Sequence, residues 1–296
     1  MPGEIASRGR RISVLVSTFN RRELTLASLE RLLGSASPGL ELSVHLVDSS
    51  SSDGTPEAVA AAYPDVTITS VSSDHYWVAA MRAGFDQAIA DDPDHLLMYN
   101  DDTMLGEAAL TRLVEAAELL AQRGDAAGIV TGTLCDAASG AVTYGGITQD
   151  EGLRTRMRFR SHVTPGDEPK RADTCNFNLA LIARPAYRAV GNLDGAFTHS
   201  MADLDYGLRA RAAGYPTWVA PGFHGTCSDN PEKVAWQDRR LRPSERWKMV
   251  RGPKGLPPRE FALFCRRWGG PAWPILAVAP YARLLLSPAS DDGSGA

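Results

Sequence analysis

The segment ISVLVSTFNR, Ile12–Arg21, decides the fold class of the chain. Its first part, Ile12–Ser17, is an apolar run of the kind found in parallel strands that are buried on both faces. A strand buried on both faces needs helices on either side of its sheet. The run therefore predicts an α/β domain in which helices and strands alternate along the chain.

The residues that follow this strand continue the alternation. Leu26, Leu29 and Leu33 have helical spacing and predict one apolar helix face. Thr55 and Pro56 are of the types that form an N-cap and a first-turn proline. Further elements are expected at Leu42–Val47 (strand), Val66–Val71 (strand), Ala79–Ala90 (helix), His95–Tyr99 (strand) and Glu107–Gln122 (helix). This order predicts a Rossmann-like, mostly parallel, doubly wound sheet flanked by helices.

The second half of the chain is less regular. Strand patterns occur at Ile129–Thr133, Val142–Ile147, Arg154–Arg160 and Phe177–Ala183, and a helix at Ala202–Ala213 ends before Gly214. We expect a flexible tail over residues 1–11, one α/β domain over 12–226, a basic and aromatic, largely helical C-terminal extension over 227–289, and a disordered tail over 290–296.

The composition excludes several classes of protein. A formal net charge of −4 argues against a general nucleic-acid binder. No pair of cysteines has C-x-x-C spacing, so neither a zinc site nor a disulfide framework is expected. Residues 1–11 lack the apolar core of a signal peptide, and no stretch has the roughly 18 apolar residues of a membrane span. These features predict a cytoplasmic protein.

Acidic residues stand at the ends of predicted elements at three places. Asp48 ends a strand, the pair Asp101 and Asp102 ends another, and Asp203 and Asp205 begin a helix. The carboxyl ends of strands in such sheets are where ligands bind. Adjacent carboxylates at a strand end repel each other unless they share a cation or a proton. Hard oxygen ligands of this kind suit Mg²⁺ or Mn²⁺, which in turn suit a diphosphate.

Four segments together carry a resemblance to a known family. They are ISVLVSTFNR (Ile12–Arg21), LVDSSSSDGT (Leu46–Thr55), MYNDDT (Met98–Thr103) and the block from Cys175 to Tyr215 that includes MADLDYGLRARAAGY. In this order they resemble the inverting family 2 glycosyltransferases of the GT-A fold, over about Ile12–Cys227. The resemblance implies a nucleotide-sugar half at 12–105 and an acceptor half at 106–226. It also implies transfer of a sugar from a UDP- or dTDP-type donor to an acceptor hydroxyl, with Mn²⁺ or Mg²⁺ as cofactor.

The resemblance implies roles for individual residues. The donor-binding positions are Thr18, Asn20, Asp48, Arg82, Asp101 and Asp102. Asp102 matches the metal-binding aspartate of the D-x-D motif, and His224 falls where a metal-binding histidine returns in this fold. Asp203 matches the catalytic base. Two positions depart from the pattern, because Asn100 replaces the first aspartate of the metal motif and Ala202 replaces the glutamate before the base.

Structural explanations compete with several of these roles. Asp101 and Asp102 could form a solvated turn. Asp203 could take part in a capping box with Ser200. Asp205 could pair with Arg209 four residues later.

Two further site residues also have plain structural readings. Arg82 could be an ordinary surface arginine on a helix, and His224 a buried structural histidine. Arginines 154, 156, 158 and 160 alternate along one predicted strand and could bind an anionic acceptor or protect a strand edge.

Three other functions compete with glycosyl transfer. A nucleotidyltransferase would show a glycine-rich basic loop after the first strand, but Ser17–Asn20 contains no glycine. A non-catalytic nucleotide- or glycan-binding module would give Asp203 no role. A hydrolase with paired carboxylates does not account for the nucleotide-site resemblance.

The C-terminal extension has its own pattern. Lys233–Lys254 contains eight Lys or Arg and two acidic residues, and the apolar, proline-punctuated stretch Trp268–Ser287 follows it. Cations bind anionic headgroups and aromatic rings settle at the interface, so this order predicts peripheral contact with a membrane. Such contact suits a lipid-linked or cell-envelope glycan acceptor. Packing against the catalytic domain, or a homodimer interface, is the alternative.

Overall fold

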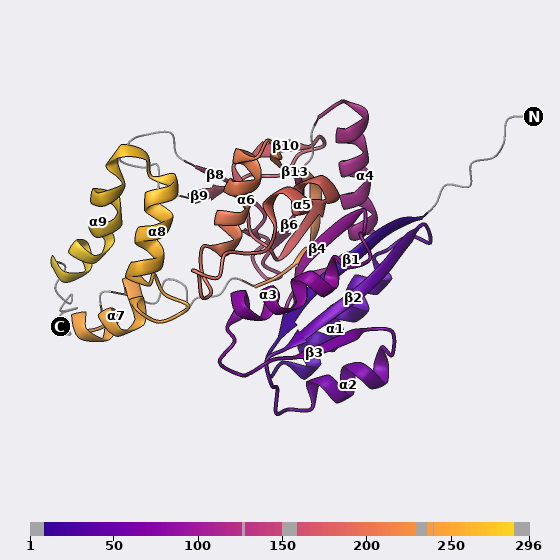
Figure 1. Ribbon diagram of the computed structural model, residues 1–296, viewed down its shortest axis with the longest axis horizontal. Helices are drawn as coiled ribbons and strands as arrows, with labels where there is room; N and C mark the ends of the chain where they lie inside the picture. The colour runs from indigo at the N-terminus through magenta and orange to yellow at the C-terminus, as the bar shows by residue number, and fades with distance from the viewer. Residues whose placement is uncertain (1–8, 126–127, 150–158, 229–235, 239, 287–296) are drawn as a thin grey trace, which may run out of the picture.

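The computed structural model describes residues 9–125, 128–149, 159–228, 236–238 and 240–286 (Figure 1). Its first part contains β1 (Arg10–Thr18), α1 (Arg22–Gly34), β2 (Leu40–Asp48), α2 (Thr55–Ala62), β3 (Thr67–Ser70), α3 (Trp77–Ala88), β4 (His95–Asn100) and β5 (Met104–Leu105). The next part contains α4 (Ala109–Gln122), β6 (Ile129–Cys135), β7 (Val142–Tyr144), β8 (Gly146–Gln149), β9 (Phe159–His162), β10 (Lys170–Ala172), β11 (Thr174–Cys175), β12 (Leu179–Ala183), α5 (Arg184–Val190), α6 (Ala202–Ala212) and β13 (Thr217–Thr226). The extension contains α7 (Pro243–Val250), α8 (Pro258–Trp268), the 3₁₀ helix η2 (Gly270–Ala272) and α9 (Trp273–Leu286).

A ten-stranded sheet forms the centre of the molecule, with the order β10-β13-β6-β12-β4-β1-β2-β3 and with β5 and β7 pairing off this path. The strands β3, β2, β1 and β4 run parallel to one another, with Thr18 beside Asp48 and Ser17 beside Asn100. The strand β12 runs antiparallel between β4 and β6, and β13 returns parallel to β6. This arrangement confirms the predicted mostly parallel α/β sheet and brings the carboxyl ends of β1, β2 and β4 to one edge.

Two apolar layers cover the sheet. Along β1, Val14 and Val16 pack into one layer with α1, α2 and α4, whereas Leu15 packs into the other layer with α3, α5 and α6. Successive side chains of a strand point to opposite faces, so an apolar run such as Ile12–Val16 serves both layers at once.

Two local predictions differ from the structure. In α1 the buried face contains Thr25, Ser28, Leu29 and Leu32, while Leu33 is exposed. Thr25 and Ser28 are buried because their hydroxyls form hydrogen bonds with Thr18 and Tyr99. The residue that caps α2 is Gly54 in the left-handed conformation, not Thr55. Asp53 accepts hydrogen bonds from the Thr55 amide and hydroxyl, so the aspartate supplies the polar contact expected of a cap.

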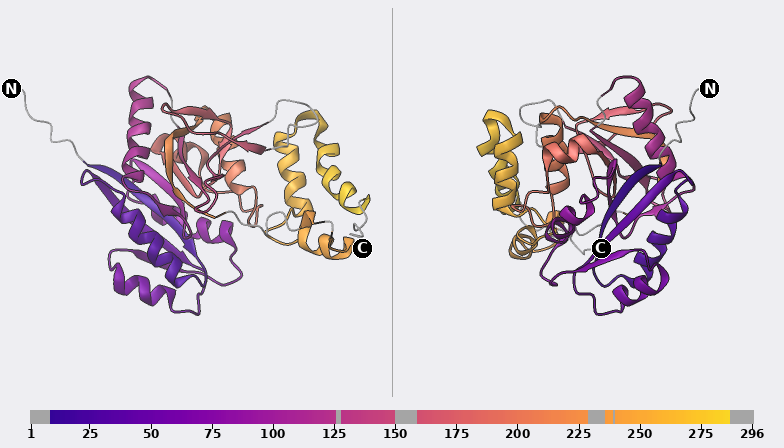
Figure 2. Two further views of the ribbon diagram at one scale, coloured as in Figure 1. Left: turned by 180° about the vertical axis from the view of Figure 1, so that it is seen from behind. Right: turned by 45° about the vertical axis from the view of Figure 1, so that its right-hand side comes forward.

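The helices α7, α8 and α9 gather at one side of the molecule, with α8 facing the part of the chain that contains α6 (Figures 1 and 2). Phe261, Phe264 and Cys265 of α8 belong to the same apolar layer as Phe197 and Tyr206, so the extension shares the core of the α/β domain. Arginines 154, 156 and 158, the tails 1–8 and 287–296, and the start of the basic segment at 233–235 lie outside the described residues. No helix in the described ranges is long and apolar enough to cross a bilayer.

Candidate active site

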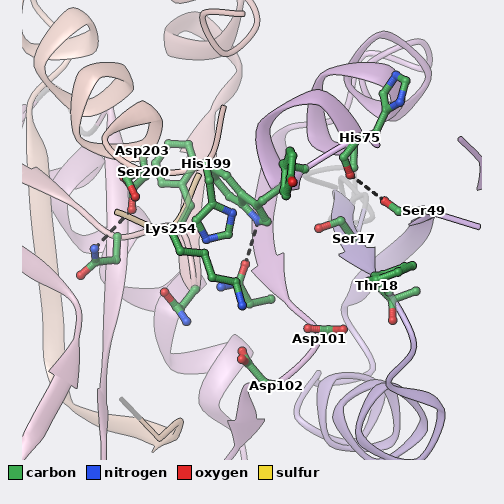
Figure 3. A pocket seen from close by; sticks show the side chains of 18 of the residues that line it. Ser17, Thr18, Ser49, His75, Asp101, Asp102, His199, Ser200, Asp203 and Lys254 are labelled. Carbon is green, nitrogen blue, oxygen red and sulfur yellow. Dashed lines mark hydrogen bonds between the residues drawn. The ribbon is translucent and has the colours of Figure 1, made fainter. Parts of the chain in front are cut away.

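One cavity of about 620 Å³ lies at the carboxyl edge of the parallel strands (Figure 3). Its volume is within the range of small-molecule sites. Its walls come from the β1 and β2 ends, the start of α3, the β4 turn, the segment before β12, the start of α6 and the loop between α7 and α8. The charged, amide and histidine residues that line it are Arg21, His75, Asn100, Asp101, Asp102, Asn176, Asn178, His199, Asp203 and Lys254.

The turn after β4 holds Asp101 and Asp102 in place. The Thr103 amide donates to the Asn100 carbonyl at 3.2 Å, which closes the turn. The Tyr99 hydroxyl donates to the Thr103 carbonyl at 2.6 Å and itself accepts from the Ser28 hydroxyl at 2.8 Å. Tyr99 and Ser28 are fully buried, so the carboxylates are carried on a rigid support.

Arg21 joins the two carboxylates. Its Nη1 lies 3.0 Å from Asp101 Oδ1 and 3.0 Å from Asp102 Oδ2. Burial raises the pKa of Asp101 to about 6, although the neighbouring Arg21 cation lowers it in part. The pair is therefore neither an ordinary solvated turn nor an uncompensated charge, and Asp102 is its more exposed member.

Asp203 lies in the first turn of α6 and faces the cavity. Its Oδ2 accepts from Asn176 Nδ2 at 3.3 Å, and its Oδ1 accepts from the amide of the next residue, Leu204, at 2.8 Å. The N-cap of the helix is Met201, in the left-handed conformation and without a side-chain hydrogen bond. The capping box of Ser200 and Asp203 is thus not formed, and Asn176 is the residue that orients the carboxylate.

Asp205 has a structural role. It is completely buried, and its Oδ2 accepts from Arg209 Nε at 2.9 Å, which confirms the pair predicted from their spacing. Its Oδ1 also accepts from Arg267 Nη1 and from Trp268 Nε1, both at 3.0 Å. Helix α6 is therefore joined to α8 of the extension through one carboxylate.

The predicted nucleotide-binding residues occupy neighbouring loops. Thr18 lines the cavity and shares a hydrogen bond of 2.8 Å with Thr25. Asn20 has a left-handed backbone and its Oδ1 accepts from the Ser52 amide at 2.7 Å, which ties the β1 loop to the β2 loop. Asp48 is buried behind the cavity wall, where its Oδ2 accepts from the Ser51 amide at 3.0 Å. Asn20 and Asp48 thus shape the two loops from outside the lining.

Two predicted residues lie away from the cavity. Arg82 donates to the Leu193 carbonyl and supports the loop before α6, as a structural arginine would. His224 is completely buried in β13, and burial lowers its pKa to about 4. Neither ring nitrogen of His224 has a partner at hydrogen-bond geometry among the described residues. Besides its contact with Arg21, Asp102 accepts from the Cys227 thiol, whose Sγ is 3.5 Å from Oδ1.

The sequence did not single out several lining residues. Arg21 was visible beside the first strand, but nothing local indicates a partner 80 residues away. Trp77 begins α3 and donates from Nε1 to Asn100 Oδ1 at 3.2 Å. Asn176 lies in the Cys175–Tyr215 block, where the available signal is the alternation of the polar Asn176 and Asn178 with the apolar Phe177. In the sequence, Lys254 stands out only as a member of the basic segment Lys233–Lys254.

Comparisons with known proteins agree with this geometry. The model of glycosyl transferase family 2 matches residues 13–133, which contain β1 to β4 and the Asp101–Asp102 turn. Among solved structures, the mannosyltransferase PcManGT from Pyrobaculum calidifontis, in complex with GDP-Man and Mn²⁺, is similar with a TM-score of 0.51 and 19% identity. That similarity covers 98% of this chain and 77% of that chain. The search of curated proteins finds no match. The family 2 match thus falls on the segment that builds one side of the cavity, and the whole chain shares the fold of that mannosyltransferase.

Proposed function

We propose that the protein transfers a sugar, with inversion, from a nucleoside-diphosphate sugar to an acceptor hydroxyl, and that Asp203 is the base. The observation that supports this most directly is that Asp203 lines the same cavity as Thr18, Asp101 and Asp102. Figure 3 shows Asp203 and the Asp101–Asp102 pair at different sides of that cavity. The predicted nucleotide-binding residues Thr18, Asp101 and Asp102 and the predicted base thus line the same cavity.

The position of Asp203 suits proton removal. Inversion requires a base on the face of the sugar opposite the leaving group, within reach of the acceptor hydroxyl. Asn176 and the Leu204 amide each donate to one oxygen of Asp203, so these two donors orient the carboxylate. In the proposal, Oδ2 takes the hydroxyl proton as the acceptor oxygen attacks the sugar carbon.

The carboxylates of the β4 turn fit a Mg²⁺ or Mn²⁺ ion that arrives with the donor. Magnesium in particular keeps several waters and is held by one or two carboxylates together with substrate phosphates. Asp102 is partly exposed to the cavity and Asp101 is beside it. Among the described residues, no group of three His, Cys, Asp or Glu is arranged to hold an ion by itself. When bound, the ion would neutralise charge that develops on the leaving diphosphate.

We propose Asp102 as the main protein ligand of this ion. The predicted second ligand, His224, lies outside the cavity lining, and its buried position does not support contact with an ion at Asp102. Its role as a ligand stays a prediction, and a metal titration of variants tests it below.

The donor and the pathway are the finer parts of the proposal. We propose a UDP- or dTDP-linked sugar as the donor, and the structural neighbour adds GDP-mannose as a candidate because it was solved with that ligand. The acceptor is proposed to be a glycan or a lipid-linked saccharide of the cell envelope. The enzyme is proposed to act in the cytoplasm or at the inner face of its membrane.

A donor screen tests the reaction. The full chain is incubated with each nucleotide sugar and Mn²⁺, with and without saccharide acceptors, and free nucleoside diphosphate and glycosylated product are measured. Product with the inverted anomeric configuration is expected. A nucleotidyltransferase would form no glycosylated product here, but with a nucleoside triphosphate and a sugar 1-phosphate it would form a nucleotide sugar and release pyrophosphate. A binding module would be stabilised by nucleotide but release nothing.

We also propose that the extension contacts an anionic membrane. The α9 side chains Ile275, Val278 and Leu285 are spaced for one helix face, and all are exposed, as is Leu286. Exposed cations stand at Arg259 and Arg266 of the neighbouring helix α8 and at Arg283 of α9. An apolar helix face with flanking cations complements the interface of a bilayer that contains anionic lipid.

Vesicle co-sedimentation tests the membrane contact. We expect binding to vesicles containing phosphatidylglycerol, weaker binding at physiological salt than at low salt, and loss of binding in the variant with Val278→Ser and Leu285→Ser. No binding to these vesicles at either salt would refute the proposal. A concentration-dependent dimer that the same variant abolishes, without vesicle binding, would identify a second copy as the occupant of this face.

A further inference from the structure

The loop between α7 and α8 forms part of the wall of the catalytic cavity. Lys254 and Gly255 from this loop line the cavity together with Ser200 and Asp203. In the view of Figure 3, Lys254 lies between the side that carries Asp203 and the side that carries Asp102. The extension therefore contributes a cationic side chain to a site that the α/β domain otherwise builds.

The backbone of this loop is tightly held. The Leu256 amide donates to the Val250 carbonyl at 2.8 Å, and the Leu256 carbonyl accepts from the Tyr281 hydroxyl of α9 at 2.8 Å. Gly255 passes so close to the end of α7 that a Cβ there would stand 2.3 Å from the Met249 carbonyl oxygen. Such a contact cannot be relieved by rotating a side chain, so the close turn requires glycine at this position.

The loop is also fixed relative to the catalytic segment. On α8, the Glu260 carboxylate accepts from the Thr198 amide at 3.0 Å and from its hydroxyl at 2.7 Å. The Ser200 hydroxyl lies 3.5 Å from the Pro253 carbonyl. These contacts join the residues just before Asp203 to Pro253 and Glu260, which stand on either side of Lys254 in the chain.

Binding of an anionic donor in this cavity needs a cation besides Arg21. Three carboxylates line it, those of Asp101, Asp102 and Asp203, and the lysine and arginine side chains described in its lining are Arg21 and Lys254. Arg21 pairs with the two carboxylates of the β4 turn. A nucleoside diphosphate would add further negative charge to this acidic cavity, and ammonium groups bind phosphate oxygens by charge-assisted hydrogen bonds.

We propose that Lys254 binds the diphosphate of the donor, so that the C-terminal extension is a part of the donor site rather than an appendage. This inference rests on the proposed function, because it requires a nucleoside-diphosphate ligand. Lys254 would hold the phosphates in the bound donor and oppose the negative charge that builds on them as the bond to the sugar breaks.

The test is calorimetric binding of a nucleoside diphosphate and of the matching nucleoside. The diphosphate is the one, among UDP, dTDP and GDP, that binds the wild-type chain most tightly. Lys254→Gln should weaken diphosphate binding about tenfold or more and leave nucleoside binding unchanged, since only the former has the anion. Lys254→Arg should restore part of the affinity. Lys248→Gln is the matched control, because Lys248 is an exposed lysine of α7 that does not line the cavity.

Several outcomes would overturn the assignment. Equal diphosphate affinity in wild type and Lys254→Gln would remove Lys254 from the donor site. Equal losses for diphosphate and nucleoside would mean that the substitution only disturbs the loop. Unchanged diphosphate affinity with a raised KM for a phosphorylated acceptor would move the cation to the acceptor. Failure of the proposed function itself is distinguishable, since the wild-type chain would then bind none of the diphosphates.

Discussion

Thr198 and Glu260 are joined by two hydrogen bonds, from the backbone amide and the side-chain hydroxyl of the threonine to the two oxygens of the glutamate, at 3.0 and 2.7 Å. One residue lies just before the helix of the proposed base, and the other lies in the first turn of α8. The contact couples the segment before α6 to the docking of α8.

Breaking this contact should affect both stability and turnover. Glu260→Ala leaves the Thr198 amide and hydroxyl without their acceptor, and bonds to a charged group are worth about 1.5–3 kcal/mol each. Because Glu260 is only half-buried and water screens both bonds, we expect their joint loss to lower the free energy of unfolding, measured in urea, by about 2 kcal/mol, and we expect a lower kcat. Glu107→Ala, at an exposed loop position, is the control. Wild-type kcat in Glu260→Ala would show that the extension does not order the site.

The role of Asp203 is tested by a substitution that keeps its size. Asp203→Asn removes basicity, so kcat should fall about 100-fold or more while the affinity for the nucleoside diphosphate changes little. Asp65→Asn, on an exposed turn, should behave as wild type. Near-normal turnover of Asp203→Asn would exclude this residue as the base.

Metal dependence separates Asp102 from His224. Activity should be lost in excess chelator and restored by Mn²⁺ or Mg²⁺. In a titration of Mn²⁺ against thermal stabilisation in the presence of nucleoside diphosphate, Asp102→Asn should raise the half-saturating concentration about tenfold or more. His224→Leu should leave that concentration unchanged, because the ring lies outside the cavity lining. Full activity in chelator would leave Arg21 and Lys254 as the stabilisers of the leaving group.

His224 should instead make the protein sensitive to acid. Burial lowers its folded-state pKa from 6.5 to about 4, so the unfolded chain binds more protons than the folded chain between these values. Its contribution to stability is complete above pH 6.5 and is lost as the pH falls toward 4. The loss is at most about 3 kcal/mol by linkage. His224→Leu should reduce the difference in unfolding free energy between pH 7 and pH 5; an unchanged difference would mean that other groups cause it.

The parts of the fold that were predictable are those in which burial leaves a local pattern. The buried parts of β1, β2 and β4 are mostly apolar, and the bounds of these strands agree with the predictions to within about two residues. The direction of β12 left no such pattern, because an antiparallel strand between two buried neighbours has the same apolar sequence as a parallel one.

The residues of the candidate site also differ in whether the sequence could predict them. Asp101, Asp102 and Asp203 stand in short motifs at element ends, so they could be located in the sequence. The pairing of Arg21 with the carboxylates and the approach of Lys254 join residues far apart in the chain. Such contacts are created only when the elements pack, and no periodicity or spacing in the sequence encodes them.

The buried carboxylate of Asp205 has a consequence for biosynthesis. Every strand of the ten-stranded sheet has been translated by Thr226, yet two of the three side chains that donate to Asp205 are Arg267 and Trp268. A nascent chain that has emerged only as far as β13 contains the aspartate without these partners. The packing of α6 against α8 must therefore wait until α8 has left the ribosome, so every strand of the sheet is made before this contact can form.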